Sequence, residues 1–301
     1  MHVFVTGASG WIGSAVVPEL LAAGHSVLGL ARSPQSAAAI TAAGATAHPG
    51  SLDDLDSLRA GAEAADAVVH LGFKHDFTDM PGAWRTERAV VTTFCDALEG
   101  SDRPFLLAAG VAGLTSGRAA TERDPNPSQG PDSMRGGAEN LALDHADQGV
   151  RSVSVRLAPT VHGRGDHGFV ATLTDIARTT GVSGYVGDGS ARWPAVHRLD
   201  AAHLVRLALE GAPAGSVVHA VAEEGVPTRD IAEAIGRGLR VPTASVDPAN
   251  TEDHFGWIGA FFGLDIPASS ALTRDLLGWE PTRPSLLADL DAGYYTPASI
   301  R

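Results

Sequence analysis

Short apolar runs alternate with alanine-rich segments along the first half of the chain, and the two kinds of segment differ in period. The apolar runs predict strands at 3–5, 26–30, 45–49, 67–71, 105–109 and 152–157. The alanine-rich segments predict helices at 12–23, 36–43, 55–64, 84–98 and about 135–147. Such alternation makes βαβ units, and the unbroken apolar run at 67–71 is typical of a strand covered on both faces. The pattern predicts an α/β fold with a doubly wound parallel sheet.

The alternation of apolar runs and alanine-rich segments ends at about residue 160. Gly, Pro and His become frequent from Pro159 to His197, and one further strand (216–221) and helix (228–239) follow. We therefore expect a sheet domain over 1–160, completed by 195–225, and a smaller, loop-rich lobe over 161–301 that is interleaved with it. The stretch 121–131 is a loop by composition, and a loop of that length is usually functional or mobile.

Composition and charge exclude several classes of function. The 301 residues carry 22 basic and 35 acidic side chains, a net charge of −13, which would repel nucleic acid and anionic lipid. The single cysteine, Cys95, excludes an internal disulfide framework and a cysteine-cluster metal site. No apolar run approaches the ~18 residues of a membrane span, and a strand rather than a leader opens the sequence. We expect a cytoplasmic protein without nucleic-acid or membrane partners.

The strongest chemical signal is Thr-Gly-Ala-Ser-Gly-Trp-Ile-Gly at 6–13, which follows the first strand and opens the first helix. Gly7 permits a tight turn, Gly10 lets the backbone approach a pyrophosphate, and Gly13 lets helix and strand pack closely. The helix N-terminus adds N–H groups and a positive dipole for the phosphates. Glycine triplets also occur in ordinary turns, but the strand, helix and second strand in register indicate a Rossmann-type dinucleotide-binding domain.

The residue sequence of this loop resembles that of the short-chain dehydrogenase/reductase superfamily. Within the superfamily it resembles the extended or atypical branch, the NAD-dependent epimerase/dehydratase family. Four further segments carry the resemblance along nearly the whole chain. They are Val-His-Leu-Gly at 69–72, Arg-Leu-Ala-Pro-Thr-Val-His-Gly at 156–163, Val-His-Arg-Leu-Asp at 196–200 and Leu-Leu-Gly-Trp-Glu-Pro at 276–281. The resemblance implies a set of cofactor-binding positions, with Ser51 in place of the family's Asp beside the adenine: Gly7, Ser9, Gly10, Trp11, Ile12, Gly13, Ser51, Leu52, Leu71, Gly72, Phe73, Pro159 and Val161.

The end of the second strand distinguishes the two dinucleotides. An NAD site usually has a carboxylate here for the ribose hydroxyls, and an NADP site has a small residue with a nearby cation for the 2′-phosphate. Ala31 stands at the acid's position, Arg32 can pair with a phosphate, and Ser33 can add a hydroxyl donor. Arg32 as a plain surface residue is the competing interpretation, and the missing acid favours NADP over NAD.

The resemblance fails at the catalytic positions. The superfamily typically uses Ser or Thr at the end of the fifth strand and Tyr-x-x-x-Lys on the next helix. Here Ala109 takes the Ser position, Pro131 the Tyr position and Arg135 the Lys position, and no tyrosine occurs between residues 1 and 184. Arg135 can hold the nicotinamide ribose or orient a substrate oxygen, but its pKa above ~12 prevents useful proton exchange.

Lys74, His75 and Asp76, just past the fourth strand, are the alternative acid–base candidates. The resemblance implies that this loop borders the nicotinamide. A histidine titrates near neutrality and suits general acid catalysis, and Asp76 can orient the ring of His75. A solvated charged loop is the competing interpretation of the same three residues.

Three residues of the second lobe are substrate candidates. His162 stands where the family has Tyr, and it is either a pocket-lining residue or a structural histidine. Tyr185 and Trp193 flank a segment that resembles the family's Gly-x-Gly loop over the substrate, although core packing also explains Trp193.

A metal site is not expected in this lobe. The loop at 161–168 holds His162, Asp166 and His167, with His197 further along the chain. The loop lacks helical histidine spacing, and Arg164 lies within it.

These features predict an NADPH-dependent oxidoreductase of the carbonyl reductase or dehydrogenase type that acts on a small organic carbonyl or alcohol. The lost Ser and Tyr leave two alternatives open: a dinucleotide-binding sensor or scaffold without turnover, and a non-redox isomerase or cyclase.

We also expect a homodimer. The helices at 84–98 and 135–147 correspond to those that form a four-helix interface in the family. Their apolar residues can form that interface or face the sheet of their own subunit: Ala89, Val90, Phe94, Leu141 and Leu143.

Overall fold

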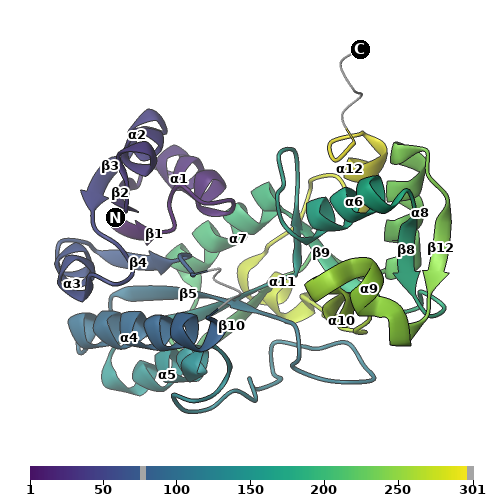
Figure 1. Cartoon of the computed structure of the whole chain (residues 1–301). Coiled ribbons are helices and arrows are strands. Elements are labelled where there is room, and N and C mark those ends of the chain that lie inside the picture. The colour runs from purple at the N-terminus through teal and green to yellow at the C-terminus, as the bar shows by residue number, and fades with distance from the viewer. Residues whose placement is uncertain (75–78, 297–301) are drawn as a thin grey trace.

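The structure is a computed structural model that describes residues 1–74 and 79–296. A large sheet with its helices forms one part of the molecule, and two small sheets with theirs form the other (Figure 1). The large sheet contains β1 (His2–Thr6), β2 (Ser26–Ala31), β3 (Thr46–Pro49), β4 (Ala67–His70), β5 (Pro104–Gly110), β6 (Arg151–Leu157) and β10 (Ser216–Ala220). Its flanking helices are α1 (Gly13–Ala22), α2 (Pro34–Ala42), α3 (Leu55–Glu63), α4 (Met80–Leu98), α5 (Ala138–Asp144) and α7 (Arg198–Gly211).

All seven strands of the large sheet are parallel, in the order β10-β6-β5-β4-β1-β2-β3. The chain winds outward from β1 in both directions, so a switch point lies between β1 and β4 at the carboxyl edge. The sequence prediction of a Rossmann-type, doubly wound parallel sheet with a smaller C-terminal lobe is confirmed.

The strands β1, β2, β4 and β5 of this sheet divide their side chains between two cores. Val3 and Val5 face the core under α1 and α7, whereas Phe4 faces the core under α3 and α4. The same alternation recurs at Val68 and Val69 of β4. Burial on both faces explains why these strands appear in the sequence as continuous apolar runs.

The second lobe contains more regular structure than its composition predicts. Its small sheets have the orders β11-β9-β7 and β12-β8. The strands are β7 (Thr160–His162), β8 (Ser183–Val186), β9 (Arg192–His197), β11 (Glu223–Pro227) and β12 (Thr243–Val246). The helices are α6 (Phe169–Thr180), α8 (Thr228–Leu239), α9 (Thr251–Phe255), α10 (Gly259–Phe262), α11 (Ala271–Leu277) and α12 (Leu286–Asp291), with 3-10 turns η3 (Pro248–Asn250) and η4 (Gly256–Ile258). Expecting this lobe to be loop-rich was wrong, because strands such as Glu-Glu-Gly-Val-Pro of β11 and Thr-Ala-Ser-Val of β12 lack the continuous apolar runs of the large sheet.

Two of the segments that resemble the family lie in direct contact. The carboxylate of Asp200 accepts hydrogen bonds from the backbone N–H groups of Thr282 and Arg283, at 3.1 and 3.0 Å. The indole of Trp279 is fully buried and donates to the Asp200 carbonyl at 3.1 Å. The start of α7 thereby fixes the C-terminal segment against the large sheet.

A buried ion pair anchors the long loop between β5 and α5. The Arg156 guanidinium on β6 bonds the Glu139 carboxylate at 2.6 Å and the Asp124 carbonyl at 2.8 Å. Both side chains of the pair are almost fully buried. Two residues before Asp124, Glu122 accepts from the backbone and hydroxyl of Thr273 on α11. The loop at 121–131 is thus tied to the sheet and to the second lobe.

Within the part of the chain that the structure describes, no helix is both long and apolar enough to traverse a lipid bilayer.

Candidate functional site

The glycine loop after β1 leaves no room for side chains at two of its three glycines. Gly7 has a φ of +67°, and a Cβ atom placed on it would lie 2.8 Å from the backbone N of Gly72. A Cβ on Gly13 would lie 2.0 Å from the Gly7 carbonyl oxygen. The same atom on Gly10 would meet that oxygen at 3.1 Å and nothing else within 4 Å. Gly7 and Gly13 therefore serve close packing, and Gly10 is exposed on the outside of the loop.

The start of α1 is suited to an anion. The Gly10 N–H bonds the Gly7 carbonyl, and the first helical donor is the Ser14 N–H, which bonds the Gly10 carbonyl. The N–H groups between these two precede the first turn and have no intrahelical acceptor. The first turn carries no acidic residue, so the helix dipole is left uncompensated. The residues present therefore fit the pyrophosphate of a dinucleotide.

At the end of β2, Arg32 lies at the surface, and Ser33 caps the helix that follows. Arg32 is exposed, and Ala31 before it is buried. Ser33 is the N-cap of α2: its hydroxyl accepts from the Ser36 N–H at 3.1 Å, and Ser36 bonds back to the Ser33 backbone. This capping box occupies the Ser33 hydroxyl as an acceptor. A contact of Ser33 with a 2′-phosphate stays a prediction.

The loop after β4 lies close to the loop after β3. A Cβ on Gly72 would lie 3.1 Å from Thr6 Oγ1 and 3.4 Å from Leu52 Cδ2, so these segments converge on the glycine loop. Lys74 forms an ion pair with Asp53, on the side of the predicted adenine contacts. The other acid–base candidates of this loop, His75 and Asp76, lie outside the described residues.

A chain of buried polar side chains runs from the glycine loop to Arg135. Thr6 Oγ1 lies 2.6 Å from His70 Nδ1, and His70 Nε2 lies 3.3 Å from Glu87 Oε2. The other Glu87 oxygen accepts from Arg135 Nη2 at 2.6 Å. Burial works to raise the pKa of Glu87, and the charges of Arg135 and His70 outweigh it and hold the pKa below its usual value. Glu87 is therefore a carboxylate at neutral pH.

The Arg135 side chain lies beside the loop after β4. Its guanidinium stacks on the Phe73 ring, 4.7 Å from the ring centroid. The structure thus brings together the predicted catalytic Arg135 and the predicted cofactor residues Gly72 and Phe73, although these belong to segments far apart in sequence.

The backbone at Arg135 corrects the predicted helix at 135–147. Arg135, Gly136 and Gly137 all have positive φ, at 53°, 61° and 62°, and α5 begins only at Ala138. A Cβ on Gly136 would meet Arg88 Cβ and the Trp84 carbonyl oxygen, each at 2.8 Å. A left-handed non-glycine residue costs roughly 1–2 kcal/mol, and the tightly packed glycines behind Arg135 enforce it. The prediction placed the start of the helix too early because left-handed residues do not disturb an apolar pattern.

The glycine loop also contacts the second lobe, through Trp11. The indole N–H donates to the Val161 carbonyl at 2.7 Å. The Arg198 guanidinium lies 4.3 Å from the Trp11 ring centroid, and the ring of His167 meets it edge-on at 5.6 Å. Trp11 and Val161, both predicted to bind cofactor, are therefore in direct contact. The two other predicted neighbours, Ile12 and Pro159, are both half-buried, and Ile12 packs against the core of the large sheet.

His162 belongs to a buried cluster that joins β7, β9, β11 and α12. Its Nδ1 lies 2.7 Å from the Asp289 carboxylate, its ring meets His197 edge-on at 5.4 Å, and its Nε2 lies 4.0 Å from Glu223. Burial lowers the pKa of His162 to about 4 and raises the pKa of Asp289 and of Glu223. The ring is neutral at physiological pH, and its Nε2 has no hydrogen-bond partner among the described residues.

The remaining substrate candidates differ in exposure. The Tyr185 ring on β8 is half-buried, with the Arg229 guanidinium 5.6 Å from its centroid. Trp193 on β9 is fully buried among Phe169, Phe261 and Phe262. Its contribution to a substrate pocket stays a prediction.

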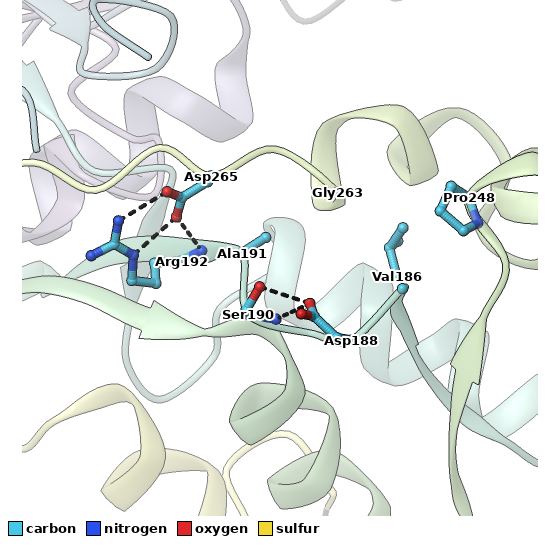
Figure 2. A pocket seen from close by; sticks show the side chains of 9 residues that line it. Val186, Asp188, Ser190, Ala191, Arg192, Pro248, Gly263 and Asp265 are labelled. Carbon is cyan, nitrogen blue, oxygen red and sulfur yellow. Dashed lines mark hydrogen bonds and ion pairs between the residues drawn. The ribbon is translucent and has the colours of Figure 1, made fainter. Parts of the chain in front are cut away.

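A cavity of about 580 Å³ lies in the second lobe, next to the turn that joins β8 to β9. Figure 2 shows the side chains that line it. Arg192 donates from two nitrogens to the two oxygens of Asp265, at 3.0 and 2.9 Å. Asp188 accepts from the Ser190 hydroxyl at 2.7 Å. The lining comprises Val186, Gly187, Asp188, Ser190, Ala191, Arg192, Pro248, Gly263 and Asp265.

The sequence interpretation missed the polar residues beneath Arg135. His70 lies within an apolar strand run, and Glu87 precedes Val90, Val91 and Phe94 at the spacing of one helix face. A charged residue on an apolar face is the signal that could have identified Glu87.

A sequence model of the NAD-dependent epimerase/dehydratase family matches residues 3–221. The chain belongs to this family. Uncharacterized proteins of two yeasts are similar over nearly its full length: one of Schizosaccharomyces pombe is 46% identical over 296 residues, and one of Saccharomyces cerevisiae is 45% identical over 296 residues. These matches cover 98% of this chain and 100% and 99% of the two relatives.

Solved structures of family members share the fold. UDP-glucose 4-epimerase of Thermus thermophilus, in complex with NAD, superimposes with a TM-score of 0.75 at 18% identity, over 99% of this chain and 100% of the other. The dTDP-glucose 4,6-dehydratase DesIV of Streptomyces venezuelae, also with NAD, gives 0.76 at 19% identity, over 98% and 96%.

We predict that Gly10→Val abolishes dinucleotide binding and leaves the fold intact. A side chain at this exposed position meets one atom, the Gly7 carbonyl oxygen at 3.1 Å, which has to shift by a few tenths of an ångström. The side chain would then fill the space next to the unpaired N–H groups of α1. Calorimetric titration with NADPH and NADH measures the binding, and circular dichroism checks the fold. Gly13→Ala is the matched control, because its Cβ would collide with the Gly7 carbonyl and lower stability itself. Unchanged affinity in Gly10→Val would contradict the assignment of the loop.

We predict that His162 makes the fold less stable as pH falls. Its pKa in the folded protein, about 4, lies below the usual value of 6.5, so the unfolded chain binds the proton first. Stability present above pH 6.5 is therefore lost on acidification towards pH 4, by about 2 kcal/mol between roughly pH 7 and pH 5. The raised pKa values of Asp289 and Glu223 act in the opposite direction.

The measurement is urea unfolding of wild type and His162→Asn at both pH values. The amide keeps a donor for Asp289 and removes the titrating ring. We expect the variant to lose less stability than wild type on acidification, and equal losses would show that His162 does not contribute.

Proposed function

We propose that the protein is an NADPH-dependent oxidoreductase that acts on a small organic carbonyl or alcohol. The observation that carries the cofactor choice is the end of β2, where buried Ala31 replaces an acid and Arg32 is exposed beside it. Two relatives support redox chemistry by their names. A ketoreductase of Stigmatella aurantiaca is 27% identical over 225 residues, and a sterol-4-alpha-carboxylate 3-dehydrogenase of Dictyostelium discoideum is 36% identical over 73 residues.

Arg135 is the residue that we assign to the reacting end of the site. When NADPH is bound, the nicotinamide supplies the hydride. The Arg135 guanidinium, stacked on Phe73, binds the nicotinamide ribose or the substrate oxygen and favours negative charge there. It keeps its own proton, so the proton must come from another group, and Lys74 and His75 stay our candidates. Lys74 would first have to leave Asp53.

The substrate side is assigned to the second lobe, with His162, Tyr185 and Trp193 as candidate residues. The cavity of this lobe is lined by two carboxylates, Asp188 and Asp265, and by one cation, Arg192, which forms an ion pair with Asp265. The excess of negative charge disfavours a diphosphate, although several structural neighbours carry nucleotide-sugar names. It supports a small uncharged substrate.

A non-redox reaction is the second candidate function. Buried Ala109 and exposed Pro131 stand where a superfamily reductase places Ser and Tyr. A chain without these groups can retain the dinucleotide site for an isomerase or cyclase, or as a sensor without turnover.

We propose that the protein works in the cytoplasm as a homodimer formed through α4 and α5. Val90 and Phe94 are fully buried in the core of their own subunit and cannot contribute. Ala89, Leu141 and Leu143 are half-buried and remain candidates for the interface.

The test of the proposed function is the consumption of NADPH in the presence of small aldehydes and ketones. Substrate-dependent loss of NADPH absorbance is the expected result. Product formed without NADPH oxidation would favour the isomerase or cyclase, and tight binding with neither change would favour the sensor.

We predict that Arg32 makes NADPH bind more tightly than NADH. A charge-assisted contact with the 2′-phosphate gives a preference of roughly ten- to a hundredfold, and Arg32→Ala should remove most of it. The double variant Ala31→Asp with Arg32→Ala should prefer NADH, because the new carboxylate accepts from the ribose hydroxyls and repels phosphate. Titrations at fixed low salt measure each affinity. If wild type binds both cofactors equally, or if Arg32→Ala weakens both equally, Arg32 is only a surface residue.

A further inference from the structure

The buried side chains between the glycine loop and Arg135 form one continuous hydrogen-bonded chain. Its members come from β1, β4, α4 and the 3-10 turn η1 (Met134–Gly137), so it crosses from the sheet to the outer helix layer. The Gly72 N–H donates to Thr6 Oγ1 at 3.1 Å and adds the loop after β4 to the chain. Movement at either end is therefore resisted by the same set of bonds.

Each donor that faces along this hydrogen-bonded chain of side chains has an acceptor within it. Glu87 is a carboxylate, so both of its oxygens accept, one from Arg135 and one from His70 Nε2–H. His70 Nδ1 is hydrogen-bonded to the Thr6 hydroxyl, whose oxygen accepts from the Gly72 N–H. Each of these described side chains thus has a partner for the group that faces the chain.

The two ends of the Glu87–Arg135 pair differ in exposure. The side chain of Glu87 is 2% exposed and that of Arg135 is 33% exposed. Glu87 therefore cannot touch a bound molecule, whereas Arg135 has five N–H donors, of which the described contacts with Glu87 use one. The buried carboxylate holds the guanidinium on the Phe73 ring and leaves other donors available to a ligand.

We infer that Glu87 is a positioning residue, which fixes the Arg135 guanidinium against the nicotinamide half of the bound dinucleotide. This inference rests on the proposed function, because it takes the dinucleotide to lie across the glycine loop, Gly72 and Phe73. A purely structural role explains the pair less well. A buried ion pair adds little net stability compared with apolar packing, and here its cation is the half that reaches the surface.

The test compares two ligands that share one half. NADPH contains the nicotinamide, whereas 2′,5′-ADP has only the adenosine half with its 2′-phosphate. Glu87→Gln keeps the shape and one acceptor oxygen of the side chain, and it removes the charge that holds Arg135. We expect the affinity for NADPH to fall by roughly tenfold and that for 2′,5′-ADP by less than about twofold. Fluorescence and calorimetric titrations measure both.

A double-mutant cycle separates positioning from general damage. If Glu87 acts through Arg135, adding Glu87→Gln to Arg135→Ala should change the ratio of the two affinities no further. Glu139→Gln is the matched control, since Glu139 is also a buried carboxylate paired with an arginine but lies in the separate network of Arg156. It should lower stability and leave the ratio at the wild-type value.

The outcomes distinguish the two claims. If wild type binds neither NADPH nor NADH, the proposed function fails and this inference fails with it. If wild type binds NADPH and Glu87→Gln weakens both ligands equally, or neither, only the inference is overturned. Should Glu87→Gln not fold, the ratio is read in Glu87→Asp, which keeps the charge but withdraws it by one methylene group. An unchanged ratio there also overturns the inference.

Discussion

The close approach of three backbone segments at Gly7 is the constraint on which the rest of the site depends. The loop after β4 and the start of α1 both lie so near this residue that a single methyl group at Gly7 or Gly13 would separate them. Because β1 and β4 are neighbours at the switch point of the sheet, this contact sets the position of everything that follows either strand. The loop after β4 continues to Phe73, and Phe73 in turn supports Arg135. The packing at Gly7 thus links the position of the glycine loop to that of Arg135.

Two buried glutamates show how this acidic protein uses its scarce cations. Glu139 pairs with Arg156 to fasten the long loop to the sheet, and Glu87 pairs with Arg135 at the edge of the site. The first pair is almost fully buried, whereas the second retains a partly exposed guanidinium. The same chemical pair therefore anchors the fold in one place and presents a charge to solvent in the other.

The large sheet could be predicted from the sequence because two-sided burial leaves long apolar runs, as in β4, and because the glycine loop stands in a strand–helix context. The second lobe could not, since strands such as β8 (Ser-Gly-Tyr-Val) and β12 (Thr-Ala-Ser-Val) contain no continuous apolar run. The site was predictable only in part. Gly7, Gly13 and Gly72, each named from the sequence, lie together, but the left-handed run at Arg135 depends on packing against Arg88 and Trp84, which no local pattern encodes. His70 and Glu87 were missed because their partners lie on other elements.

The indole of Trp11 gives the molecule a property that neither lobe has alone. Its hydrogen bond to the Val161 carbonyl connects the start of α1 to β7 of the second lobe, and the Arg198 guanidinium covers the same indole from the start of α7. Separation of the two lobes would have to break the Trp11–Val161 hydrogen bond, which lies at the loop whose N–H groups are suited to an anion.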